Sequence, residues 1–152
     1  MKGIEIPQEE LEVVIDINIS SYIPDDYISN KDQKIEAYQN IALCRTKEDI
    51  EDITQNISDR YGKMPKEVKN LIDIAEIKEY AKNVGITKIS QKQNNIVFNF
   101  EPKLFALDID KLVKKHKNRI KFSSSIKPYF TYKLQSEQNS VEEVRKLLLC
   151  NE

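Results

Sequence analysis

The segment Ser58–Pro65 constrains the fold most, because it ends one predicted helix and begins the next within a few residues. Apolar residues recur at helical spacing before it, at Ile50, Ile53 and Ile57. Gly62 can adopt the left-handed backbone of a helix C-terminal cap, and Pro65 fixes φ for the first turn of a new helix. The segment therefore predicts a corner between two helices, with the adjacent pair Asp59 and Arg60 at the end of the first. Such a pair is typical of a solvated helix end, so the local pattern alone favours an ordinary exposed turn.

The elements around this corner predict an α+β fold. An N-terminal strand is expected from Leu11 to Ile19, where apolar and polar residues alternate. Three consecutive helices follow, and the strand-rich second half carries two further helices. Runs of helices followed by runs of strands favour helices packed on a small mixed sheet over a doubly wound fold. After the first strand, the predicted helices lie at 31–43, 46–61, 65–84, 108–117 and from 140, and the predicted strands at 87–90, 95–100, 119–122 and 129–134.

Local signals define several of these elements. Thr46 with Asp49 is a variant capping box, and Ser140 with Glu143 is predicted to cap the last helix. The segment Gln91–Asn94 is predicted to connect two strands as a hairpin. The predicted inward faces are Ile35, Tyr38, Ile41 and Ala42 in the first helix, and Val141, Val144, Leu147 and Leu148 in the last.

At 152 residues, with 39% hydrophobic and 32% charged residues, the chain has the size and composition of one globular domain. We expect residues 1–10 to be the end of a linker from a preceding domain, in an excised fragment, and residues 11–152 to form a single domain. The sequence has no apolar run long enough to span a membrane and no signal pattern at its start. Cys44 and Cys150 are expected to be buried free thiols, which favours a cytoplasmic location.

The sequence carries no pattern typical of independent catalysis. The three glycines, Gly3, Gly62 and Gly85, form no phosphate-binding loop, and two cysteines with one distant histidine form no zinc motif. No serine lies in a nucleophile-elbow pattern. His116 lies among lysines, which favours a solvated side chain over a metal ligand. We therefore expect no enzyme activity, no metal and no cofactor.

The segment Lys111–Lys133 is basic and contains no acid, although the net charge of the chain is only −1. It could be a nucleic-acid-binding surface, with its cations on phosphates and its aromatic residues stacked on bases. It could also be the solvated surface of a helix and two strands. Alternation predicts that Phe130, Tyr132 and Leu134 face the core, which leaves only Tyr129 to stack on a base and favours the solvated surface.

Four motifs, densest between Ile15 and Ile89, carry a resemblance to a known family. They are, in order, Ile23-Pro24 with Tyr27-Ile28, the helix Lys34–Ala42, the corner Asp59–Pro65 and the helix exit Val84-Gly85-Ile86. Together they make the chain resemble the C-terminal domain of the bacterial transcription-repair coupling factor (Mfd) family.

The resemblance implies a regulatory C-terminal domain without catalysis, at residues 11–152, in a parent that is an ATP-driven DNA translocase. In that family the domain docks on the protein's own N-terminal UvrA-binding domain. Docking masks UvrA recruitment and restrains the translocase until RNA polymerase is engaged. The implied partners are the N-terminal domain directly, UvrA indirectly, and RNA polymerase and DNA through other domains. A membrane is not among them, and the fragment is expected to be monomeric.

The same resemblance places the interdomain interface at Asn56, Asp59 and Arg60. Asp59 and Arg60 match the corner motif, whereas Asn56 stands three residues earlier, where the family often has an acid. The first helix also departs from the family's usual residues, at Lys34, Gln39 and Asn40. A purely structural tether that closes the end of the translocase is an alternative role.

Overall fold

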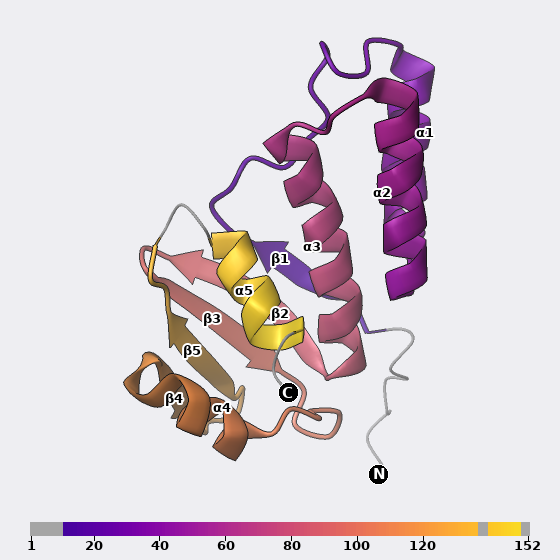
Figure 1. Cartoon of the computed structure of the whole chain (residues 1–152). Helices are drawn as coiled ribbons and strands as arrows, with labels where there is room; N and C mark the ends of the chain where they lie inside the picture. The colour runs from indigo at the N-terminus through magenta and orange to yellow at the C-terminus, as the bar shows by residue number, and fades with distance from the viewer. Residues whose placement is uncertain (1–10, 137–139, 150–152) are drawn as a thin grey trace. The chain divides into compact units, whose positions relative to one another are not determined.

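A computed structural model of the chain describes residues 11–136 and 140–149 (Figure 1). These residues form two compact units. The helical unit takes residues 19–79, and the sheet unit takes the described residues before 19 and from 80 onward. The predicted α+β fold class is confirmed, with five α-helices and one five-stranded mixed sheet in the described residues. Residues 1–10, the predicted end of a linker, and Cys150 lie outside the described residues.

The helical unit is built from α1 (Lys31–Ala42), α2 (Lys47–Tyr61) and most of α3 (Lys66–Asn83). The predicted capping box at the start of α2 is confirmed, because Thr46 and Asp49 each accept a hydrogen bond from the other's backbone N–H. Bonds from the backbone N–H groups of Arg45 and Thr46 hold the pKa of Asp49 below its ordinary value. The helix therefore begins at a carboxylate that stays charged at neutral pH.

Gly62 follows α2 with φ of 90° and ψ of −166°. The positive φ agrees with the prediction, but this ψ lies outside the left-handed helical region of the expected cap. The Gly62 N–H still bonds to the carbonyl of Ser58, as the last turn of a helix requires. Pro65 precedes α3, and its carbonyl accepts from the N–H groups of Val68 and Lys69.

The core of the helical unit is aliphatic, apart from one cysteine. It takes side chains from the loop before α1, from the three helices and from the α1–α2 connection: Ile23, Ile28, Ala37, Ile41, Cys44, Ile53, Ile57, Val68 and Ile72. The expected burial of Cys44 is confirmed, and the thiol lies in the connection between α1 and α2.

The predicted inward face of α1 is partly wrong. Ala37 and Ile41 are buried, whereas Ile35 is 45% exposed and Ala42 is exposed. Successive residues are about 100° apart around a helix, so Ile35 lies nearly opposite Ala37. The helix contacts the core through one narrow stripe, and its apolar residues outside that stripe remain in solvent.

The sheet has the strand order β1-β2-β3-β5-β4. Strand β1 runs parallel to β2, and the other neighbouring pairs are antiparallel. The predicted first strand is shortened to three residues, because only Val14–Asp16 pair with β2. The β2–β3 connection is also shorter than predicted: only Gln93 and Asn94 form the turn, with Gln93 at a φ of 55°. The strands are β1 (Val14–Asp16), β2 (Ile86–Lys92), β3 (Asn95–Phe100), β4 (Ile120–Ser123) and β5 (Tyr129–Lys133).

Helices α4 (Ile109–His116) and α5 (Ser140–Leu149) pack on one face of this sheet (Figure 1). Tyr132 of β5 marks that face, because its ring contacts His116 of α4 and its hydroxyl bonds to Glu143 of α5. The core between sheet and helices is aromatic, with Phe98 and Phe130 stacked at a centroid distance of 4.5 Å. The predicted stripe of α5 is buried, at Val141, Val144, Leu147 and Leu148.

Glu143 has a different role from the predicted cap of Ser140. Its carboxylate accepts from the backbone N–H groups of Gln135 and Ser136, and from the hydroxyl of Tyr132. The side chain therefore joins α5 to β5 and to the segment that follows it. None of the helices in the described ranges combines the length and the apolar character needed to cross a bilayer.

Candidate functional site

The three predicted interface residues lie in the last turns of α2, and all three are exposed. Asn56 and Arg60 are one turn apart and face the same side of the helix. Asp59 accepts a 2.7 Å hydrogen bond from the side-chain amide of Gln55, which is also one turn away. The structure thus brings Asn56 and Arg60 together and leaves Asp59 on a neighbouring strip of the helix surface.

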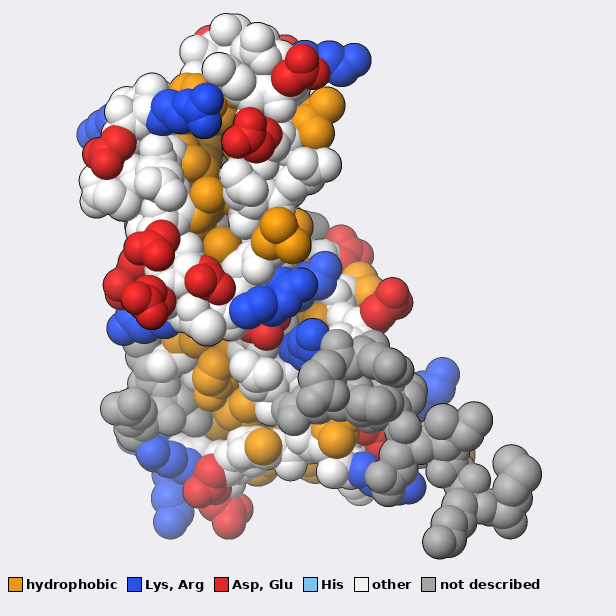
Figure 2. Space-filling model, turned by 90° about the vertical axis from the view of Figure 1, so that its right-hand side faces the viewer, with side chains coloured by type: hydrophobic (Ala, Val, Ile, Leu, Met, Phe, Trp, Pro, Cys, Tyr) orange, Lys and Arg blue, Asp and Glu red, His pale blue; other side chains and the backbone are white. Residues whose placement is uncertain are grey.

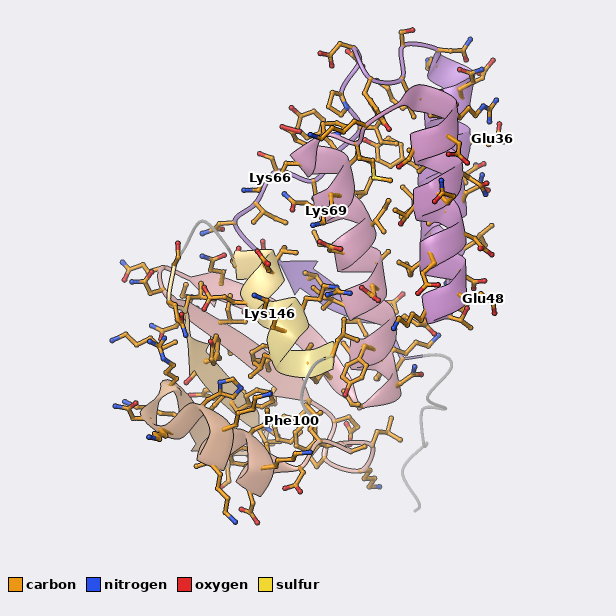
Figure 3. The ribbon with its side chains drawn as sticks, in the orientation of Figure 1. Glu36, Glu48, Lys66, Lys69, Phe100 and Lys146 are labelled. Carbon is orange, nitrogen blue, oxygen red and sulfur yellow. The ribbon has the colours of Figure 1, made fainter. Side chains whose placement is uncertain are left out.

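Asn56 and Arg60 line a groove between α1 and α2 with a volume of about 310 Å³. Its base is apolar and buried, at Ala37, Ile53 and Ile57. Figure 2 shows this arrangement as hydrophobic side chains in a furrow between ridges of polar and charged ones. The rim is polar and comes from both helices, with Gln33, Glu36 and Asn40 from α1 and Asn56 and Arg60 from α2. Figure 3 labels Glu36 on this rim.

Aromatic side chains hold the corner at the end of α2. The guanidinium of Arg60 lies 5.4 Å from the centroid of the Tyr61 ring, an arrangement worth about 0.5–1 kcal/mol at an exposed site. Tyr27 packs against Tyr61 and donates a 2.7 Å hydrogen bond to the carbonyl of Gly62. Burial, with a smaller effect from Tyr61, raises the pKa of Tyr27, so its hydroxyl remains a donor. The corner is therefore a preorganised surface.

The basic segment does not present its aromatic residues as a stacking surface. Phe130 and Tyr132 are buried in the sheet core, as alternation predicted, and Tyr129 is half-buried on the opposite face. The prediction of a solvated His116 is wrong, because its ring packs edge-on against Tyr132 at a centroid distance of 5.4 Å. Burial, together with Lys115 and Arg119, lowers the pKa of His116.

The chemistry of the site is that of a polar contact surface. The groove offers amides, one carboxylate and one guanidinium around an apolar base. The described part of the chain contains no group of three or more histidine, cysteine or acidic residues placed to hold a metal.

Comparison with known proteins identifies the family. The model of the TRCF domain family matches residues 17–112, which is more than half of the chain and includes the groove. The chain belongs to the TRCF domain family. The resemblance inferred from the four motifs is thereby confirmed.

Relatives of this TRCF domain are much longer proteins. The transcription-repair-coupling factor of Staphylococcus aureus (strain USA300) is 41% identical over 92 residues, which are 60% of this chain and 8% of that protein. The transcription-repair-coupling factor of Borreliella burgdorferi is 31% identical over 117 residues, covering 75% of this chain and 10% of that protein. The chain thus spans about a tenth or less of the curated relatives it matches.

A solved structure shares the fold of this TRCF domain. The crystal structure of the C-terminal domain of transcription-repair coupling factor superposes with a TM-score of 0.80 at 22% identity. The match covers 92% of this chain and 91% of that chain. The chain therefore has the fold of a transcription-repair coupling factor C-terminal domain.

Three of the four TRCF motifs contact one another in the helical unit. The first motif meets the corner through Tyr27 and Gly62, and it meets the α1 motif where the Tyr38 hydroxyl accepts a 2.8 Å bond from the Ile23 N–H. Lys34 of the α1 motif also pairs with Asp25 in the first. The residues of these motifs therefore make the contacts that hold the corner in place.

Sequence reasoning missed the α1 side of the groove. Glu36 and Asn40 lie one turn apart on α1 and face Asn56 and Arg60 across the apolar base. The sequence indicated this side of the groove only in part, because Asn40 stands at one of the positions where α1 departs from the family pattern. That α1 lies beside α2 could be seen only in the structure.

Proposed function

We propose that this TRCF domain is a non-catalytic regulatory domain that docks on the N-terminal UvrA-binding domain of the same protein. Docking would cover the surface that recruits UvrA and restrain an ATP-driven DNA translocase in the parent until RNA polymerase is engaged. In this proposal residues 11–152 act as one cytoplasmic, monomeric regulatory domain. The family match supports the general role, and the groove between α1 and α2 carries the proposed location.

The groove has the chemistry that a reversible autoinhibitory contact within one protein requires. Its rim has one carboxylate, Glu36, and one guanidinium, Arg60, among neutral amides, so it can orient a partner through polar contacts. Its apolar base is small, which keeps the contact weak. A weak contact is sufficient because a tethered partner has an effective concentration in the millimolar range. Weakness also allows an opposing partner to shift the equilibrium by its differential affinity.

The proposal assigns no catalysis and no cofactor to this chain. A purified sample should hydrolyse no ATP and bind no nucleotide, because the sequence contains no phosphate-binding loop. ATP turnover that a single substitution within this chain abolishes would contradict this part of the proposal.

The decisive test uses the full-length protein with Asp59→Ala and Arg60→Ala together. Both side chains are exposed, so the free energy of unfolding should change by no more than about 1 kcal/mol, mostly through loss of the Arg60–Tyr61 contact. Capture of the full-length protein on immobilised UvrA should increase several-fold, because the docking of this domain on the N-terminal domain is weakened.

The matched control is Lys47→Ala with Glu48→Ala. This adjacent opposite-charge pair is exposed at the other end of α2 and outside the groove, and Figure 3 labels Glu48. The control pair should leave UvrA capture unchanged. If the Asp59 and Arg60 variant is folded and binds UvrA with the same affinity as wild type, the corner is not part of the interface.

A further inference from the structure

The sheet unit has a second polar surface on the face opposite α4 and α5. Side chains alternate between the two faces of a sheet along each strand. The residues on this face are therefore those that alternate with the core residues, and strand register places them side by side. Among the described residues of this face, none is buried. We call it the open sheet face; it consists of Val14, Asp16, Lys88, Ser90, Lys92, Asn95, Val97, Asn99, Lys121, Ser123, Tyr129, Thr131 and Lys133.

The open sheet face is strongly basic. It carries four exposed lysines, at Lys88, Lys92, Lys121 and Lys133, and one acid, Asp16, on the edge strand β1. Register places Lys92 and Lys133 on either side of Asn95, so their strands are about 10 Å apart. Lys88 and Lys92 come from outside the basic segment Lys111–Lys133, so the sheet assembles this surface from distant parts of the chain.

One end of the open sheet face is hollowed. A cavity of about 610 Å³ lies where β3, β5 and β4 meet. Its lining includes three cations, Arg119, Lys121 and Lys133, and contains no carboxylate. It also includes four amides, at Asn94, Asn95, Asn118 and Gln135. The Arg119 guanidinium donates a 3.0 Å hydrogen bond to the Lys133 carbonyl, which holds this cation at the cavity.

The fold also divides the basic segment between two surfaces. Lys111 and Lys114 lie on α4, which packs on the opposite face of the sheet. Lys121 and Lys133 lie on β4 and β5 and belong to the open sheet face. The cations of the segment therefore cannot all contact one ligand.

We propose that the open sheet face binds the phosphate backbone of single-stranded nucleic acid, without sequence preference. Separated cations along one sheet face match a polymer with regularly spaced negative charges, and amide donors can hydrogen-bond to phosphate oxygens. An acidic peptide would need apolar anchor pockets, and the apolar residues of this face are only Val14, Val97 and Tyr129. With one half-buried aromatic, binding is electrostatic and weak, with a dissociation constant of about 10⁻⁴ to 10⁻⁶ M at physiological salt.

The test is a fluorescence anisotropy titration of the whole chain with a labelled oligothymidine of about 12 nucleotides. It compares wild type with the variant Lys92→Gln, Lys121→Gln and Lys133→Gln, at salt concentrations from about 50 to about 200 mM. The matched control removes the same charge from α4 and its end, by Lys111→Gln, Lys114→Gln and Lys117→Gln. All six side chains are exposed, and thermal melting checks that each variant folds.

The open-face variant should lose at least about tenfold in affinity at the lower salt, and its log–log salt slope should fall by about two. The control should lose less than about threefold. The double variant Lys88→Gln with Lys92→Gln changes only β2 and should lose less affinity than the triple variant. It replaces the triple variant in the test if that variant fails to fold. The proposal is overturned by equal losses in variant and control, by absence of binding at about 50 mM salt, or by equally tight binding of labelled polyglutamate.

Discussion

The helical unit and the sheet unit are stabilised by different kinds of core. The sheet unit buries stacked aromatic rings, and Phe98 and Phe130 are both fully buried. The helical unit buries mainly isoleucine and smaller side chains, and Tyr27 and Tyr61 lie half-buried at the edge of this core, beside the corner. The aromatic core is buried between the sheet and its helices, whereas the groove between α1 and α2 exposes a polar rim over buried aliphatic side chains. This groove is where the proposed docking surface lies.

The sharpest way to test this comparison is to remove a buried ring from the sheet unit. Phe130→Ala should lower the free energy of unfolding by about 3–5 kcal/mol, because it deletes a fully buried aromatic side chain and leaves a cavity. Urea denaturation followed by circular dichroism measures the change. Phe122→Ala is the control, since Phe122 is 45% exposed and should cost much less. Equal losses in the two variants would mean that the rings of the sheet core do not carry its stability.

Two glycines offer a matched comparison between the units. Gly85→Ala should destabilise strongly, because φ is +82° and an added Cβ would lie 2.5 Å from the backbone carbon of Leu104. Gly62→Ala meets no atom within 4 Å, so it should cost only the backbone strain of about 1–3 kcal/mol. Thermal unfolding of both variants measures the difference. A Gly85 variant as stable as the Gly62 variant would contradict the close packing at the start of β2.

A smaller effect is expected from pH, and it should arise in the sheet unit. The pKa of His116 is lowered by burial and by Lys115 and Arg119, while the unfolded chain protonates near a pH of about 6.5. Below that pH the unfolded state binds a proton that the folded state does not, so stability falls as pH decreases towards the folded pKa. Urea denaturation at about pH 7.5 and about pH 5.5 should show this loss.

His116→Phe is the variant for this test, because it keeps a ring against Tyr132 and removes the only histidine of the chain. The loss of stability between the two pH values should shrink in the variant. An identical pH dependence in wild type and variant would show that other groups are responsible.

Local signals in the sequence predicted most elements of the fold. The capping box at Thr46, the buried stripe of α5 and the alternation along β5 each depend on residues close together in the chain. The partial burial of His116 depends instead on its contact with Tyr132 of β5, and the exposure of Ile35 depends on which side of α1 meets the core. The lysines around His116 and the apolar side chain of Ile35 do not indicate these contacts.

Each of the two proposed surfaces also depends on residues that the sequence motifs did not indicate. Asp59 and Arg60 could be named from a motif, but the groove needs Glu36 of α1. The open sheet face needs Lys88 and Lys92 of β2 beside the basic segment. Pairings of this kind are set by helix packing and strand register, which a single sequence does not display.

The most direct test of the docking proposal is a calorimetric titration of this chain into the N-terminal UvrA-binding domain of the same protein. Saturable one-to-one binding is expected below about 1 mM, the effective concentration that a tether supplies. Asn56→Ala with Arg60→Ala should weaken it at least about tenfold, as expected when polar groups central to a contact are lost. Lys47→Ala with Glu48→Ala should have no effect. Absence of binding up to about 1 mM, or equal affinity of both variants and wild type, would contradict the docking proposal.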